Sequence, residues 1–151
     1  MVEELDLAPG QTVLEIGGGS GYHAAVVAEV VCKIPKGHVY SVEIKVELVD
    51  FARQNLEKAG YNEKVTMIQG DGSLGYSKQA PYDRIFVTCA APDIPEPLIN
   101  QLKENGKLLI PVGSTFYSEL TRVTKVKNKL LRSKLGGCAF VPMVGELGHN
   151  I

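Results

Sequence analysis

A glycine-rich run near the start of the chain is the segment best suited to holding a small ligand. Glu15 is followed by glycines at positions 17, 18, 19 and 21, between an apolar run and an expected helix. Glycine adopts left-handed conformations and lets a ligand approach the backbone with no side chain in the way. The free N–H groups at the start of the next helix favour an anionic group. Four glycines in five positions exceed the needs of a plain strand-to-helix turn, which is the alternative interpretation.

The spacing of these glycines excludes two common phosphate-binding motifs. The dinucleotide pattern G-x-G-x-x-G fails because, counted from Gly17 and Gly19, its last position is Tyr22. No Gly-Lys-Ser or Gly-Lys-Thr follows, so the run is not a P-loop. The order Glu-x-Gly-x-Gly-x-Gly instead resembles motif I of the S-adenosylmethionine-dependent methyltransferases. The ligand of that motif carries a carboxylate and an ammonium group, so the resemblance implies an acidic partner near the loop.

Two acidic residues at the ends of later apolar runs could complete such a site. Glu43 ends an expected strand, and its carboxylate could accept two hydrogen bonds from a ribose diol. Asp71 lies between two glycines after another expected strand and could accept a hydrogen bond from an adenine amino group. A solvated surface glutamate and a simple Asp-Gly turn are the structural alternatives. Since parallel strands bind ligands at their carboxyl ends, we expect both acids to converge on the glycine loop.

The hydrophobic pattern predicts the elements that position these residues. Its period changes repeatedly between two and three-to-four, which is typical of an α/β domain. The predicted strands are Thr12–Ile16, His38–Val42, Val65–Gln69, Tyr82–Thr88 and Lys107–Pro111; the predicted helices are Ser20–Cys32, Val46–Ala59 and Pro95–Leu102; a hairpin of Leu120–Val126 and Leu130–Leu135 and an extended segment, Cys138–Val144, follow. We expect a mostly parallel sheet with helices on both faces and an antiparallel C-terminal edge.

Length, charge and cysteine usage limit the class of protein. The 151 residues fit a single domain, 1–151, and the net charge of −1 does not favour nucleic acid as a partner. No apolar run approaches the roughly 20 residues needed to cross a membrane, and the start lacks the features of a signal peptide. The cysteines, at 32, 89 and 138, form no CxxC pair. We therefore expect no metal site, no membrane partner and a cytoplasmic location.

Longer stretches of the sequence extend the resemblance from the general class to one family. The runs VLEIGGGSGYHAAVVAEV, VYSVE, GDGSLGYSKQAPYDRIFVTCAAPDIPEPLINQLKENGKLLIPVG and AFVPMVGE resemble the protein-L-isoaspartate (D-aspartate) O-methyltransferase family over roughly residues 3 to 147. The resemblance implies a Rossmann-like, three-layer α/β/α fold with a seven-stranded sheet. It also implies transfer of a methyl group from S-adenosyl-L-methionine, leaving S-adenosyl-L-homocysteine, to the α-carboxylate of L-isoaspartyl residues in damaged proteins and peptides.

The resemblance also implies roles for particular residues. The implied cofactor-binding residues are Glu15, Gly17, Gly19, Ser20, Gly21, Glu43, Ile44, Asp71, Gly72 and Thr88. The implied substrate-binding residues are Ala90, Ala91 and Pro92, beside the methyl-transfer cleft, and Ala139, Phe140 and Val141, against the isoaspartyl peptide. The hydroxyl of Thr88 is the candidate catalytic group, which would orient the acceptor. A core-packing strand is the alternative interpretation of the 139–142 segment.

Two departures from the family leave a second hypothesis open. Val2–Leu7 has the pattern of the last turns of a helix, so we expect the chain to be N-terminally truncated and to lack a serine-containing loop that covers the cofactor in the family. Ala139 also stands where many members have arginine. The alternative is an S-adenosylmethionine-binding module with little or no activity. A nicotinamide-dependent oxidoreductase rests on fold analogy alone and is disfavoured by Tyr22.

Overall fold

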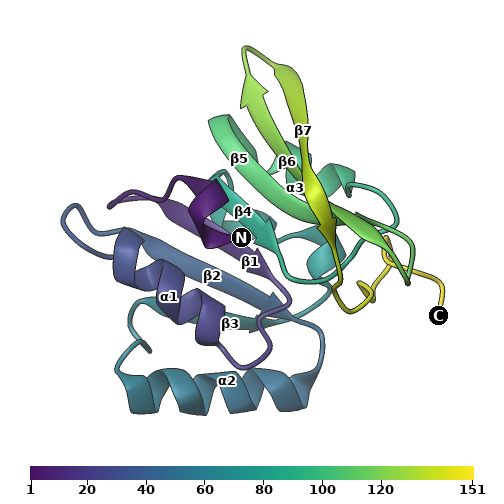
Figure 1. Cartoon of the computed structure of the whole chain (residues 1–151). Helices are drawn as coiled ribbons and strands as arrows, with labels where there is room; N and C mark the ends of the chain where they lie inside the picture. The colour runs from purple at the N-terminus through teal and green to yellow at the C-terminus, as the bar shows by residue number, and fades with distance from the viewer.

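The computed structural model describes residues 1–151 and contains one sheet of seven strands (Figure 1). The strands are β1 (Thr12–Ile16), β2 (His38–Glu43), β3 (Val65–Gln69), β4 (Tyr82–Val87), β5 (Leu102–Gly113), β6 (Ser118–Val126) and β7 (Lys129–Cys138). The α-helices are α1 (Tyr22–Val31), α2 (Val46–Ala59) and α3 (Glu96–Asn100). The strand order is β3-β2-β1-β4-β5-β6-β7, with β1 to β5 parallel and β6 and β7 antiparallel. The expected α/β fold with an antiparallel C-terminal edge is therefore confirmed.

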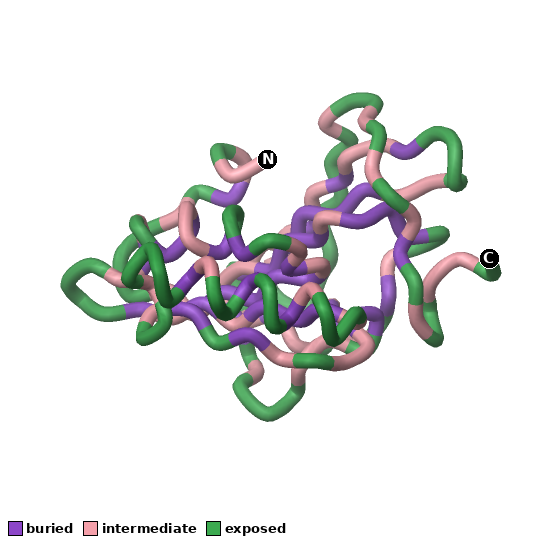
Figure 2. Tube along the Cα trace, turned by 90° about the horizontal axis from the view of Figure 1, so that it is seen from below, coloured by how far each residue is buried: buried purple, intermediate pink, exposed green.

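Both faces of the sheet are covered, as the three-layer prediction requires. Successive residues of a strand point to opposite faces, and the neighbours Val13 and Leu14 of β1 belong to two separate hydrophobic clusters. The Val13 cluster contains the apolar faces of α1 and α2, and the Leu14 cluster contains Leu98 of α3. Figure 2 shows the buried residues gathered along the central strands. The layer formed by α3 is thin, because that helix has five residues and its neighbours are two short 3₁₀ turns, Gly72–Leu74 and Ser77–Gln79.

Several boundaries differ from the sequence prediction, and β5 differs most. The Asn105-Gly106 pair was expected to close a helix, but it lies inside β5. Asn105 adopts a left-handed conformation (φ 62°), and the register against β4 shifts at this point, so the pair forms an irregularity within a longer strand. Leu102, expected to end the helix, is the first residue of β5, where it is buried and pairs with Tyr82.

The two ends of the chain also have a defined structure. Val2–Leu5, expected to be the last turns of an α-helix, is a single 3₁₀ turn whose Leu5 is fully buried. The hairpin is longer than expected; the two residues between its strands both have positive φ, as tight hairpin turns require. The predicted extended tail is confirmed, and its Pro142 forms a parallel bridge with Ala90. None of the helices combines the length and apolarity that a membrane span would need.

The strand order places one point of the fold in position to hold a ligand. From β1, the chain adds β2 and β3 on one side of the sheet, and β4 and β5 on the other. Open α/β sheets bind ligands outside the carboxyl ends of the strands at such a reversal. The glycine run follows β1 at this point, and Thr88 follows β4.

Candidate functional site

The loop between β1 and α1 exposes its backbone at Gly19. Gly17, Gly19 and Gly21 all have left-handed φ values, 90°, 53° and 84°, and Gly21 therefore delays the start of α1 to Tyr22 instead of the expected Ser20. A Cβ atom added at Gly19 would meet only the carbonyl oxygen of Gly17, at 4.0 Å. The space beside Gly19 is therefore open to a ligand.

The other side of the loop is closely packed. A Cβ atom at Gly17 would lie 2.5 Å from Oγ1 of Thr88, and one at Gly18 would lie 2.4 Å from Oγ of Ser41. The hydroxyl of Thr88 lies 2.6 Å from the carbonyl oxygen of Gly17 and 3.0 Å from that of Ile16, and it donates to these acceptors. Glycine is thus required at positions 17 and 18 because the neighbouring side chains pack against the backbone there. At position 19 glycine leaves the backbone accessible to a ligand.

Glu43 faces the loop, as the sequence predicted. Its Oε2 accepts a hydrogen bond from the N–H of Gly19 at 3.0 Å, and its Oε1 accepts one from the N–H of Lys45 at 3.0 Å. The residue is only 7% exposed. Since each carboxylate oxygen has two lone pairs, both oxygens retain a site for a further donor. The carboxylate is thus fixed beside the open glycine.

Asp71 is held at the end of β3 by three donors. Its Oδ1 accepts from the N–H and the hydroxyl of Ser73, at 2.9 and 2.7 Å, and its Oδ2 accepts from the N–H of Glu146 at 2.7 Å. Burial acts to raise the pKa of Asp71, but the hydrogen bonds from Glu146 and Ser73 outweigh it and lower the pKa below its ordinary value. The adjacent Gly72 packs against Ile16, where a Cβ would come within 2.4 Å of Cγ2. The end of β3 is therefore joined to β1.

Glu15 supports the loop from below. Its side chain is fully buried, its Oε2 accepts a hydrogen bond from the hydroxyl of Ser41, and its Oε1 has no partner. Burial raises the pKa of Glu15 to about 8, with a further contribution from the charge of Glu43. Glu15 is therefore protonated at neutral pH, and its contact with a ligand stays a prediction.

The predicted substrate segment lies beside the end of β4. The N–H of Ala90 donates to the carbonyl oxygen of Val141, and the N–H of Met143 donates to the carbonyl oxygen of Ala90, both at 2.8 Å. Two of the predicted substrate residues, Ala90 and Val141, are thus brought together. Ala91 is buried and bridges to β5. Of the others, Pro92 and Ala139 are exposed and Phe140 is half-buried.

The remaining predicted cofactor residues, Ser20 and Ile44, are held through their backbone. The carbonyl oxygen of Ser20 accepts from Nδ2 of Asn55 at 3.0 Å, and that of Ile44 accepts from Nε2 of Gln69 at 3.1 Å. The sequence interpretation did not identify Asn55, nor the supporting Ser41 and Ser73. A serine inside the apolar run VYSVE, level with Glu15 in the register, was the available signal for Ser41.

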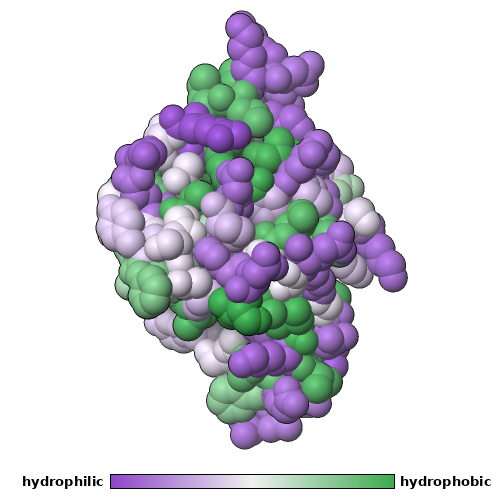
Figure 3. Space-filling model, turned by 90° about the vertical axis from the view of Figure 1, so that its right-hand side faces the viewer, coloured by the Kyte–Doolittle hydropathy of each residue, from purple (hydrophilic) through white to green (hydrophobic).

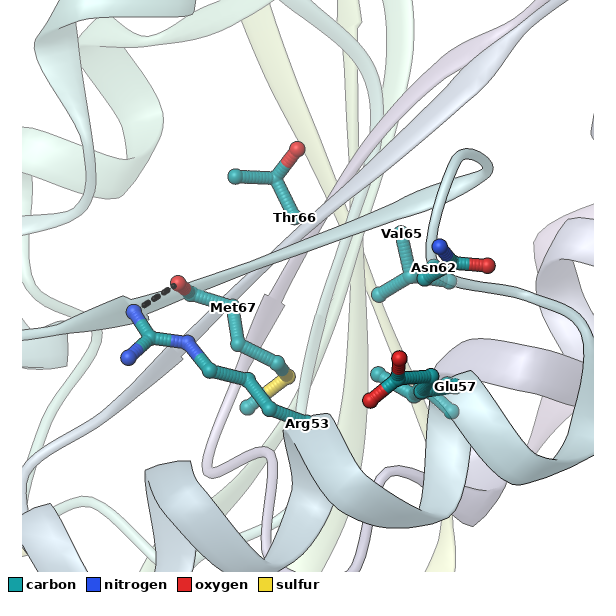
Figure 4. Close-up of a pocket in the computed structure, with 7 residues that line it drawn as sticks. Arg53, Glu57, Asn62, Val65, Thr66 and Met67 are labelled. Carbon is teal, nitrogen blue, oxygen red and sulfur yellow. Dashed lines mark hydrogen bonds between the residues drawn. The ribbon is translucent and has the colours of Figure 1, made fainter.

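A hollow in the surface lies away from the carboxyl ends of the strands. It has a volume of about 430 Å³ and lies between α2 and the outer edge of β3 (Figure 4). Its lining residues are Arg53, Leu56, Glu57, Asn62, Val65, Thr66 and Met67. Arg53 donates to the carbonyl oxygen of Met67 at 3.0 Å, so its guanidinium is already engaged. None of the predicted site residues lines this hollow.

Replacing Thr88 by valine tests its contact with the loop. The substitution keeps the side-chain shape and removes the hydroxyl that bonds to Gly17 and Ile16. We expect the free energy of unfolding to fall by about 1–2 kcal/mol in urea denaturation, because the carbonyl group of Gly17 loses this donor, whereas that of Ile16 keeps the N–H of Thr88. Thr88→Ser, which keeps the hydroxyl, should lose less. Unchanged stability of Thr88→Val would show that this hydroxyl does not hold the loop.

Comparison with known proteins agrees with this arrangement. Residues 1–148 match the profile of the protein-L-isoaspartate(D-aspartate) O-methyltransferase family. The chain is 54% identical to the protein-L-isoaspartate O-methyltransferase of Hyperthermus butylicus and 55% identical to that of Staphylothermus marinus, covering 98% of this chain in each case. A solved structure of a protein with the same name superposes with a TM-score of 0.89 at 36% identity over 97% of this chain.

A structure of a Plasmodium falciparum protein assigned to this family, in complex with S-adenosyl-L-homocysteine, has a TM-score of 0.81 at 25% identity. It matches 91% of this chain and 67% of its own. The chain spans 64% and 68% of the length of these two relatives and 46% of the first solved structure. Because the family profile and both relatives cover nearly the whole of this sequence, the chain belongs to the protein-L-isoaspartate(D-aspartate) O-methyltransferase family.

Proposed function

We propose that this chain transfers the methyl group of S-adenosyl-L-methionine to the α-carboxylate of L-isoaspartyl residues in damaged proteins and peptides. The observation that carries the proposal is the contact between Gly19 and Glu43 at the reversal of strand order, next to open space. Family membership supports the same reaction. The product of the cofactor would be S-adenosyl-L-homocysteine.

The chemistry of the strand ends fits this cofactor better than a phosphate ligand. Neither the 15–22 loop nor the 70–76 turn contains a lysine or an arginine, which a pyrophosphate would favour. The open space beside Gly19 leaves room for the cofactor, and the acceptor Glu43 suits ribose hydroxyls. Asp71 retains one free lone pair for an adenine amino group. Glu15 supports the loop from beneath, through Ser41.

The reaction requires orientation of the acceptor and needs no general base. When bound, the cofactor supplies an electrophilic methyl group. An isoaspartyl carboxylate, with an ordinary pKa of about 4, is already ionised at neutral pH. The chain's task is to align the carboxylate oxygen with the methyl carbon and to exclude water, and such alignment can lower a barrier by about 7–11 kcal/mol. Val141 would lie against the peptide backbone, and Thr88 would keep the loop in place, or orient the acceptor directly.

The role of Glu43 is tested by Glu43→Gln. The substitution keeps the size of the side chain but replaces a charged acceptor of hydroxyl hydrogen bonds by a neutral amide. We expect the affinity for S-adenosyl-L-homocysteine, measured by calorimetry, to fall by about 1–3 kcal/mol. Glu47→Gln makes the same charge change at an exposed position in the first turn of α2 and should bind as wild type. Equal affinities of the two variants would show that Glu43 does not bind the cofactor.

The reaction itself is tested with paired peptides. Methyl transfer from labelled S-adenosyl-L-methionine should occur to an L-isoaspartyl peptide and not to the same peptide with a normal aspartyl residue. Equal labelling of both peptides would reject the proposed substrate. The alternative is a module that binds the cofactor without turnover. Binding in calorimetry with no labelling of either peptide would favour that alternative.

We also propose a cytoplasmic location, with no nucleic acid among the partners. Three free thiols, at Cys32, Cys89 and Cys138, suit a reducing compartment. The net charge of −1 offers little general attraction for nucleic acid.

A further inference from the structure

The tail after β7 joins the two strand ends that the proposed site uses. Near its start, Val141 and Met143 exchange backbone hydrogen bonds with Ala90 beyond β4. Further along, the N–H groups of Glu146 and Leu147 donate to Asp71 and Ser73 at the end of β3. Met143, between these contacts, is 1% exposed and belongs to the core. We call residues 141–148 the strap.

The strap is shaped to approach the carboxylate of Asp71 closely. A Cβ atom added at Gly145 would lie 2.1 Å from Oδ1 of Asp71, so only glycine fits this position, and its φ of 142° is one that other residues rarely adopt. The N–H of Gly148 donates to the carbonyl oxygen of Gly145 at 3.1 Å, which closes a four-residue turn. This turn presents the N–H of Glu146 to Oδ2 of Asp71.

The donors around Asp71 leave it one vacant acceptor position. Of the four lone pairs of the carboxylate, Ser73 uses two, both on Oδ1, and Glu146 uses one, on Oδ2. A group with this arrangement, when ionised, accepts hydrogen bonds and donates none. The ionised carboxylate of Asp71 therefore favours a ligand amino group over a ligand carbonyl oxygen next to the unused lone pair of Oδ2.

We propose that the strap positions Asp71 to select adenine in the cofactor and couples this selection to the peptide-binding segment at Val141. The inference rests on the proposed function. Because one short segment contacts both strand ends around a buried anchor, a ligand that fixes Asp71 also restrains Val141. The side chain of Val141 is 71% exposed, so it is accessible to a peptide. Figure 3 shows apolar and polar residues mixed over one side of the molecule. Binding of the cofactor should therefore strengthen binding of the isoaspartyl peptide.

The test removes one N–H group from the strap. Glu146 is the second residue of its turn, a position that accommodates proline, so the turn can be kept in Glu146→Pro. The substitution deletes the donor to Asp71, and because the proline Cδ takes the place of that hydrogen, it also displaces the carboxylate. Glu146→Ala retains the N–H and is the matched control. Ser73→Ala, which removes the hydroxyl that contacts both Asp71 and Leu147, is an independent second variant.

Four measurements separate positioning from a general structural role. We expect Glu146→Pro to bind S-adenosyl-L-homocysteine about tenfold more weakly, and to lose most of the preference for this compound over S-inosyl-L-homocysteine. The strengthening of isoaspartyl-peptide binding by S-adenosyl-L-homocysteine should also be lost. Glu146→Ala should keep all three properties, and Ser73→Ala should follow Glu146→Pro. Hydrogen exchange of residues 141–148 without ligand should be faster in Glu146→Pro than in Glu146→Ala.

The outcomes distinguish the strap from the proposed function. If the wild type binds S-adenosyl-L-homocysteine and both Glu146→Pro and Ser73→Ala retain its affinity and preference, the strap proposal is wrong and the proposed function stands. If weaker binding in the proline variant comes without any change in preference, the strap is structural only. If the wild type itself does not bind the compound, the proposed function fails, and the strap proposal fails with it.

Discussion

Glu15→Gln is expected to stabilise the protein at pH 8 by an amount on the order of 3 kcal/mol or more. In the folded protein burial raises the pKa of Glu15 to about 8, whereas its ordinary value is 4.5. Between these values the folded protein keeps a proton that the unfolded chain has released, so the free energy of unfolding falls as pH rises, by about 1.4 kcal/mol per pH unit. Below pH 4.5 both states are protonated and this loss vanishes. Glutamine is neutral throughout and retains a partner in Ser41.

Urea denaturation between pH 4 and pH 8 measures this effect. The wild type and Glu15→Gln should have similar stability near pH 4 and should diverge steadily above it, with the variant the more stable. Glu29→Gln is the control, because Glu29 is exposed on α1 and its hydrogen bond to Tyr61 lowers the pKa instead. That variant should not show the divergence. Parallel curves for Glu15→Gln and wild type would mean that Glu15 is ionised in the folded protein.

The buried position of Glu15 lowers stability, so stability alone does not explain why an acid is found there. An acid whose neutral form is imposed by burial reduces stability at neutral pH, and such residues are concentrated at functional sites. Glu15 precedes the glycine loop and accepts a hydrogen bond from Ser41, the side chain that packs against Gly18. The acid at the first position of the Glu-x-Gly-x-Gly-x-Gly pattern therefore supports the glycine loop.

Local signals account for the elements that were predicted correctly. Helix α2 has the predicted bounds, because its apolar face is regular and Gly60 adopts the left-handed conformation (φ 80°) that ends a helix. The position of Glu43 beside the loop followed from strand order, since β1 and β2 are parallel neighbours. The long β5 was not predicted, because Asn105-Gly106 has the sequence of a turn whether it ends an element or interrupts a strand.

The contacts at the site that the sequence did not predict are made by backbone groups. Asp71 was predicted to accept a hydrogen bond from an adenine amino group, and its contact with the N–H of Glu146, 75 residues away, was not predicted. Every residue except proline has such a donor, so no side-chain pattern marks this contact. The hydroxyl of Thr88 was likewise predicted to face the acceptor, and the carbonyl oxygens that it contacts carry no sequence signal. Its catalytic role stays a prediction.

Valine substitutions at the neighbouring positions Gly18 and Gly19 should differ in their main effect: Gly19→Val should mainly weaken cofactor binding, and Gly18→Val should mainly lower stability. At Gly19 the added side chain would enter open space, so the cost in the folded protein is the left-handed backbone (φ 53°), about 1–2 kcal/mol. The same side chain would occupy the space next to Glu43 that we assign to the cofactor. We expect the affinity of Gly19→Val for S-adenosyl-L-homocysteine to fall by about 100-fold, equal to about 2.7 kcal/mol.

At Gly18 the added atoms would meet the protein itself. The new Cβ would lie 2.4 Å from Oγ of Ser41 and 2.7 Å from Cε of Met67, both buried beneath the loop. Gly18→Val should therefore lose about 3 kcal/mol of unfolding free energy, at the upper end of the usual cost of overpacking. Urea denaturation and calorimetry on both variants separate the two effects. If Gly19→Val folds and binds S-adenosyl-L-homocysteine as wild type does, the cofactor does not lie over this loop, because a ligand in contact with the backbone of Gly19 leaves no room for a valine side chain.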